Sequence, residues 1–214
     1  MKETPLLFKP EMVRATLREI NPKEQTRRLI SKLLKFGMIT EFGVSDTPGY
    51  DWHFRDKRML WNDISHDMLL ECCPYGKVGD RLWVKETWAA RPDQDHLPPS
   101  QCDDTGLWWK ASLNGTETGY AACHGKWRPS IFMPRWASRI LLEITAIRVE
   151  RLQDISDADA KAEGVSFGNI TDQVTGEIDC DAVEAYRYLW EKINGAGSWD
   201  DNPWVWVVEF KRID

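Results

Sequence analysis

The segment "NPKEQTRRLI", residues 21–30, gathers positive side chains around one hydroxyl group. Lys23, Arg27 and Arg28 crowd around Thr26, although the chain of 214 residues carries a net charge of −6. Ammonium and guanidinium groups bind anions through charge-assisted hydrogen bonds. The segment therefore predicts an anion- or nucleotide-facing site. It leaves open whether that site cuts its ligand or only holds it.

A second cluster, "KWRPSIFMPRWASRI", interleaves arginines with flat rings and includes Arg135 and Trp136. "LWVKETW" is similar and contains Trp83 and Glu86. Such mixtures suit a nucleobase and its phosphate. The alternative is a packed segment in which arginines cover indole faces. Glu86 accordingly either bonds a base edge or serves as the structural partner of an arginine.

The acidic composition, with a pI of about 5.3, argues against a wide basic surface for duplex DNA. It does not exclude a narrow basic pocket, because binding depends on the local field. The sequence has no Gly-rich phosphate loop, no H-E-x-x-H and no G-x-S-x-G. Its five cysteines lack C-x-x-C spacing, so we expect no metal and no cofactor.

The sequence contains no apolar run of the roughly 18 to 20 residues that a membrane span needs. No secretory signal precedes the cysteines. We therefore expect a cytoplasmic protein with reduced thiols and no membrane partner.

The N-terminal part predicts two helices. The first begins at Pro10 and ends at Asn21-Pro22, because the residue before a proline avoids helical geometry. "TRRLISKLLKF", residues 26–36, has helical spacing of leucines, with Gly37 as a stop. Residues 91–125 are rich in Pro, Asp, Gly and Ser. They predict a long insertion with a short strand or hairpin around "GLWWKASL".

Three strands are predicted to begin near Leu82, Ile140 and Trp204 and to belong to one sheet. The middle strand is expected to bend near Thr145-Ala146. In the last strand the apolar residues do not alternate regularly with polar ones, so this strand should be covered on both faces for part of its length.

Two later helices carry capping signals. Ser156 with Asp159 begins the first, which Gly164 ends, and Asp181 with Glu184 begins the second. The buried stripe of the second helix is predicted to consist of Val183, Tyr186, Leu189, Trp190 and Ile193, with Gly195 after it. These elements predict one α+β domain over residues 1–214, a small β-barrel with helices outside.

Five ordered motifs carry a family resemblance: "KEQTRR", "GDRLWVKETW", "MPRWASRI", "LQDISDADAKAEG" and "GSWDDNPWVWVVEF". Together they resemble an ASCH domain of the PUA-like superfamily, in the branch common in phages and prophages. The resemblance covers both ends and the middle of the chain and leaves the insertion outside. It implies a small β-barrel with flanking helices and a cleft on one side. Relatives bind RNA or modified bases.

One bacterial member of this family is an amidohydrolase that removes the acetyl group from acetylcytidine. Its site uses a lysine, a threonine three residues later and a distant glutamate. The resemblance places these roles on Lys23, Thr26 and Glu163. Where the family writes Gly-Arg-Lys-Thr-x-Thr, this chain has Pro22 and Glu24 in place of the arginine and the first threonine. These changes argue against assuming the same substrate.

Amide hydrolysis needs a nucleophile, a base and a group that stabilises the oxyanion. Thr26 offers the hydroxyl, and Lys23 can be the base if its pKa falls. Glu163 would orient the lysine or shuttle a proton, and Arg27 or Arg28 would face a phosphate or the oxyanion. The alternative makes Lys23 and Thr26 loop residues, with the threonine capping a helix.

Two functions therefore stay open. The first is a hydrolase that removes an acyl group from a cytidine-like nucleoside. The second is a non-catalytic module that binds RNA, a nucleotide or a modified base. Either predicts that Lys23, with Arg27 or Arg28, opens onto the same cleft as Trp136 or Trp83. The enzyme also predicts that Thr26, Lys23 and Glu163 converge.

Overall fold

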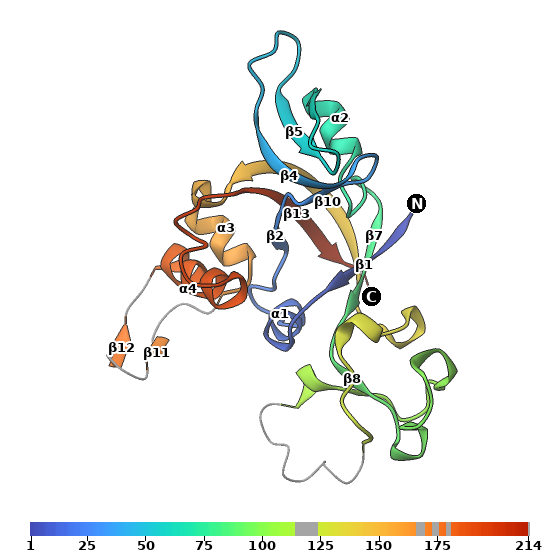
Figure 1. Cartoon of the computed structure of the whole chain (residues 1–214). Coiled ribbons are helices and arrows are strands. Elements are labelled where there is room, and N and C mark those ends of the chain that lie inside the picture. Colours follow the sequence, from blue (N-terminus) through green and yellow to red (C-terminus); the bar gives the residue numbers. More distant parts are fainter. Residues whose placement is uncertain (114–123, 166–169, 173–175, 179–180, 214) are drawn as a thin grey trace.

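A five-stranded sheet runs through the centre of the molecule (Figure 1). The computed structural model describes the whole chain except residues 114–123, 166–169, 173–175, 179–180 and 214. The sheet has the order β1-β7-β10-β13-β2, and only β1 and β7 are parallel. The bounds are β1 (Glu3–Leu7), β2 (Gln25–Leu29), β7 (Arg81–Lys85), β10 (Leu141–Arg151) and β13 (Trp204–Arg212).

The three strands predicted near Leu82, Ile140 and Trp204 are β7, β10 and β13, so the prediction that they share a sheet is confirmed. The register of β10 against β13 shifts between Ile144 and Ala146. An irregularity of this kind bends a strand, and it lies where the sequence predicts the bend.

A second, four-stranded sheet lies within residues 32–64, for which the sequence predicted no strand (Figure 1). Its order is β3-β4-β5-β6, and α2 follows it. The bounds are β3 (Lys32–Leu33), β4 (Gly37–Val44), β5 (Trp52–Asp56), β6 (Trp61–Ile64) and α2 (His66–Glu71).

The helix predicted over residues 26–36 is wrong, because this segment forms β2 and β3. Strand β2 pairs with β13 along its length, with Arg27 opposite Val207. Of the leucines with helical spacing, Leu33 is fully buried whereas Leu34 is exposed. Gly37 does end the segment, with a φ of 82°, but it does so at a hairpin between strands.

Strand β13 supplies side chains to two separate cores. Trp206, Val208 and Phe210 belong to the large core, to which both sheets and helices α1 and α2 contribute. Val205 and Val207 point to the opposite face and pack in a second core with the α3–α4 layer. The prediction that the last strand is covered on both faces is confirmed.

Helices α3 (Asp157–Ala162) and α4 (Ala182–Asn194) cover one side of the sheet, and α1 (Pro10–Thr16) lies beside them (Figure 1). Ser156 and Asp159 form the predicted capping box, and the Asp181 side chain accepts a hydrogen bond from Glu184 N. In α4, Tyr186 and Trp190 are buried as predicted.

The predicted insertion belongs to a separate lobe of short elements (Figure 1). β9 (Trp108–Trp109) is the short strand expected around "GLWWKASL", and it pairs with β8 (Trp88–Ala89) rather than with a neighbouring strand of a hairpin. Part of the insertion, residues 114–123, lies outside the described residues. The core of this satellite lobe consists of Trp88, Ala90, Cys102, Met133 and Ala137.

The remaining elements are short. They are the strands β11 (Ile170–Asp172) and β12 (Gly176–Ile178), and 3₁₀ turns at Pro92–Gln94, Pro99–Gln101, Lys110–Ser112, Ser130–Phe132, Arg135–Ala137 and Leu152–Asp154. In the part of the chain that the structure describes, no helix has the length and apolar character needed to cross a bilayer.

Candidate active site

Lys23 and Glu163 form an ion pair that is almost fully buried. Lys23 lies just before β2, and Glu163 is the C-cap residue of α3. Lys23 Nζ lies 2.5 Å from Glu163 Oε2 and donates a second bond of 2.8 Å to the Glu163 carbonyl oxygen. A backbone bond of 2.8 Å from Glu24 N to Ala162 O joins the same two segments. The convergence that the enzyme hypothesis predicts for Lys23 and Glu163 is therefore present.

Gly164 makes this close approach possible. Its φ is 78°, a conformation that L side chains rarely adopt. A Cβ at this position would lie 2.8 Å from the Cβ atoms of both Lys23 and Ala15. Only glycine fits here, so the chain leaves Glu163 in direct contact with α1 and with the Lys23 segment.

Burial and charge act on Lys23 in opposite directions. Removal from water lowers the pKa of Lys23 below its ordinary value, and the Glu163 carboxylate opposes this fall. Tyr186 of α4 is also buried, and its burial raises the pKa of the phenol well above its ordinary value, with the Glu163 charge acting in the same sense. The environment thus favours uncharged forms around one carboxylate.

The Arg27 side chain already forms ion pairs with several carboxylates. Its guanidinium is buried and lies 2.9 Å from Glu150, 3.5 Å from Asp159 and 3.9 Å from Glu163. Arg148 joins the same network through Glu150 and through a 2.8 Å bond to Asp159. Arg27 therefore neutralises the acidic side chains of β10 and α3 rather than presenting a free charge.

Thr26 lies within β2, opposite Val208, and is fully buried. The alternative in which its hydroxyl caps a helix is therefore wrong. Its Oγ1 has no hydrogen-bond partner among the residues that the structure describes. A buried hydroxyl without a partner is costly, so this group has no evident structural use.

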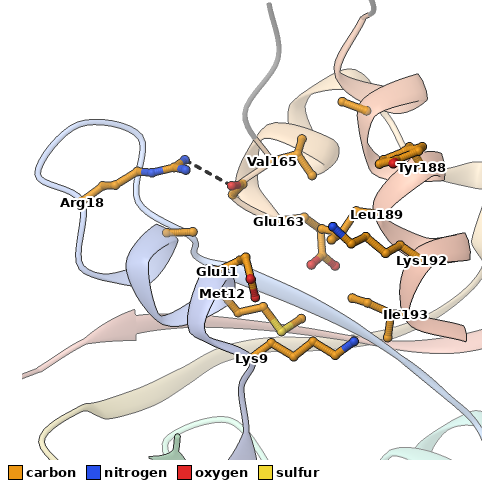
Figure 2. Close-up of a pocket in the computed structure, with 13 residues that line it drawn as sticks. Lys9, Glu11, Met12, Arg18, Glu163, Val165, Tyr188, Leu189, Lys192 and Ile193 are labelled. Atoms are coloured by element: carbon orange, nitrogen blue, oxygen red, sulfur yellow. Dashed lines mark hydrogen bonds between the residues drawn. The ribbon is translucent and has the colours of Figure 1, made fainter. Parts of the chain in front are cut away.

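A cavity of about 360 Å³ opens between α1 and α4, with Glu163 lining it (Figure 2). Its volume falls within the range of small-molecule sites. Met12, Leu189 and Ile193 give it apolar walls, and Lys9, Arg18 and Lys192 are also among its lining residues.

A smaller cavity, of about 190 Å³, shares Met12, Glu163, Leu189 and Ile193 with the larger one. It adds Arg27, Arg28 and Tyr186 to its lining. Glu163 is the one member of the predicted trio that lines either cavity, so it is the group that a ligand would meet.

The aromatic residues predicted to share this cleft lie elsewhere. Neither cavity is lined by Trp83, Glu86, Arg135 or Trp136. On β7, Trp83 alternates with the buried Leu82 and Val84, so its ring points away from the large core. The expectation of one shared cleft is wrong for these two cavities.

The same residues make structural contacts. Arg135 lies 2.8 Å from Glu3 and stacks over the Trp83 ring at 5.9 Å. Trp136 meets Trp88 edge-on at 5.9 Å. Glu86 is 1% exposed and accepts two bonds, of 2.9 and 3.1 Å, from Arg139. Of the two alternatives for Glu86, the structure shows the one in which it is the structural partner of an arginine.

Sequence reasoning missed the helical walls of the cavity. Met12 falls within the first predicted helix without a role of its own, and Tyr186 and Leu189 belong only to the predicted buried stripe. The signal that was available is the width of the apolar stripe on α4. Leu189 and Ile193 extend it beyond the buried Tyr186 and Trp190, toward α1. Within the described part of the chain, no group of three His, Cys, Asp or Glu side chains is placed to hold a metal ion.

Comparisons of the chain with protein-family models, with curated proteins and with solved structures find no match. The geometry around Lys23 and Glu163 is therefore the basis for assigning a function.

Proposed function

We propose that the chain is a hydrolase that removes an acyl group from a modified, cytidine-like nucleoside by cleaving an amide bond. The proposal includes membership of the ASCH branch of the PUA-like superfamily, with its small β-barrel. The observation that carries it is the buried Lys23–Glu163 pair, whose carboxylate lines a cavity of about 360 Å³. A charged pair removed from water and placed in a cavity wall is typical of catalytic sites.

The pair can supply the base. Transfer of the shared proton from Lys23 to Glu163 leaves a neutral amine beside a neutral carboxylic acid, and burial favours uncharged groups. The amine then takes the proton of the attacking nucleophile. The protonated Glu163, which faces the cavity, gives its proton to the departing amine nitrogen of the substrate.

Two nucleophiles fit this scheme. One is Thr26, whose hydroxyl has no hydrogen bond and lies three residues from the lysine. Attack by Thr26 on the acyl carbon expels the nucleoside amine and leaves an ester that water hydrolyses. The other is a water molecule held directly at Glu163. Thr26 lines neither cavity, which supports the water route, and Thr26→Ala distinguishes the two.

Arg28 is the cation best placed for the oxyanion. It lines the smaller cavity beside Glu163, whereas Arg27 already faces three carboxylates. One Arg28 nitrogen donates to the Leu7 carbonyl at 2.8 Å, which fixes the side chain, and its Nε has no partner among the described residues. A fixed guanidinium suits an oxyanion that develops during attack.

The test is a panel of acylated and otherwise modified nucleosides, incubated with the protein and analysed by mass spectrometry. The expected result is loss of one acyl group from a cytidine derivative by the native protein and no loss with Glu163→Gln. That variant keeps the size of the side chain and a hydrogen bond to Lys23, so it removes the proton carrier with little change in shape.

The second candidate is a binding module for a nucleotide, RNA or a modified base. The burial of Thr26 away from both cavities favours it, because the nucleophile of the family pattern would then be out of reach. Measurable binding by panel members that all remain intact would support this candidate and overturn the hydrolase.

A further inference from the structure

We infer that the larger cavity takes a ligand that bears a phosphate group, so that its natural occupant is a nucleotide and not an uncharged nucleoside. The identity of the base rests on the proposed function, but the phosphate does not. The inference comes from the side chains at the rim of the cavity, which the hydrolase scheme leaves unused.

Two rim lysines approach the cavity from opposite sides (Figure 2). Lys9 precedes α1 as its N-cap residue, and Lys192 lies on the last turns of α4. Both side chains are exposed. Neither ammonium group has a hydrogen bond or an ion pair with any residue that the structure describes. They therefore form an unneutralised positive pair across the mouth of the cavity.

The other charged side chains nearby already have partners. Lys23 is paired with Glu163, and Arg27 faces three carboxylates. Arg18 donates a 3.1 Å bond to the Gly164 carbonyl. Glu11, the acidic residue at the rim, lies 3.7 Å from Arg14. Lys9 and Lys192 are thus the lining cations that an incoming anion can reach without breaking a contact that the structure shows.

The shape of the cavity fits a nucleotide that lies between the two helices. Met12, Leu189 and Ile193 offer apolar surface to the faces of a base and its sugar. Glu163 lies among the lining side chains between the two helices, where a carboxylate can bond the edge of a nucleobase (Figure 2). A ligand with its base at Glu163 has its phosphate at the mouth, next to the two lysines.

Calorimetric titration of the full chain tests this directly. The probes are cytidine, cytidine 5′-monophosphate and a short oligoribonucleotide. At low salt the monophosphate should bind about five-fold or more tighter than cytidine, and the ratio should fall as salt is added, because exposed charges are screened. In the double variant Lys9→Gln/Lys192→Gln the ratio should approach one.

Lys57→Gln is the matched control, since Lys57 is an exposed lysine in the turn after β5 and lines neither cavity. It should leave the ratio as in the native protein. Tighter binding of the oligoribonucleotide than of the monophosphate, lost in the double variant, would support the phosphate site and identify the source as a polynucleotide.

Equal affinity for cytidine and its monophosphate, no binding of the monophosphate, or a ratio that persists in the double variant would overturn the inference. These results do not depend on whether the proposed hydrolase activity is found. A protein that prefers the monophosphate but releases no acyl group from any panel member keeps the phosphate site and loses only the proposed reaction.

Discussion

Lys23 and Glu163 are 140 residues apart in the chain, and yet Lys23 Nζ lies 2.5 Å from Glu163 Oε2 in an almost water-free environment. Each charge is tolerable there only because the other is present. The pair therefore ties the proposed catalysis to stability, and variants must be chosen so that the two effects can be separated.

Loss of one partner should destabilise the fold. We expect Lys23→Met to lower the free energy of unfolding by about 3–5 kcal/mol, because it leaves the Glu163 carboxylate buried and unpaired. Lys23→Met combined with Glu163→Leu should recover most of this loss. Urea denaturation measures both. Lys35→Met, which breaks the exposed pair with Glu71, should cost less than about 1 kcal/mol. An equally small effect for Lys23→Met would contradict a buried charge pair.

Thr26→Ala should lower stability by only about 1 kcal/mol, because it removes a buried methyl group together with a hydroxyl that has no hydrogen bond among the described residues. If Thr26 is the nucleophile, kcat falls by a factor of about 10³ or more. If water attacks at Glu163, kcat stays within a few fold of the native value. Thr26→Ser, which keeps the hydroxyl, is the control for packing. The rate of acyl-group release in a single turnover distinguishes the two nucleophiles.

The capping box of α3 should affect the site through Glu163. Ser156→Ala removes the cap and should cost about 1 kcal/mol. Because Glu163 is the C-cap residue of this short helix, fraying also displaces its carboxylate, and kcat/KM should fall by more than the stability loss explains. Ser156→Thr retains a capping hydroxyl and should behave as the native protein does. Unaltered kcat/KM in Ser156→Ala would show that Lys23 alone holds Glu163 in place.

The pH dependence should report the burial of Lys23. Burial disfavours the ammonium form, so the neutral amine appears at lower pH than the ordinary lysine pKa of about 10.4. The proposed scheme needs one proton on the Lys23–Glu163 pair, so kcat/KM should fall as pH rises through the pKa at which the pair loses that proton. Because burial lowers the pKa of Lys23, the fall should begin below the ordinary lysine pKa. A profile that still climbs past about pH 10 would refute the pair as the proton carrier.

Changes that destabilise the satellite lobe should leave the candidate active site intact. Arg139→Ala leaves Glu86 buried without its guanidinium partner, and burial already raises the pKa of this carboxyl. We expect the free energy of unfolding to fall by about 3 kcal/mol, or the lobe to unfold before the rest of the chain. Limited proteolysis detects this unfolding. Arg135→Ala, which breaks an exposed pair with Glu3, should cost less than about 1 kcal/mol. Ligand binding at the α1–α4 cavity should stay intact in both.

Local signals predicted the helical layer well. The caps at Ser156 and Asp181 and the stop at Gly164 depend on residues within one turn of each other, so the sequence alone contains them. The bend in β10 was visible for the same reason. The convergence of Lys23 with Glu163 was predicted from a family resemblance, because no local pattern links positions so far apart.

Strands β2, β3 and β4 were not predictable in this way. The leucines between β2 and β4 fit helical spacing, and β2 exists as a strand because it pairs with β13 near the other end of the chain. The aromatic clusters failed for a different reason. Arginines interleaved with tryptophans look the same whether they stack on each other, as Arg135 does on Trp83, or on a base.

The division of β13 between two cores has a consequence for ligand discovery. Val207 and Val208 are adjacent in the chain but belong to different cores, so neither core can melt without breaking the strand that the other needs. The two cores should therefore unfold as one cooperative unit, whereas the satellite lobe has a core of its own. A compound that draws α1 and α4 together would delay the melting of both of these cores. A simple thermal-shift screen of nucleotides can then find ligands before any reaction is known.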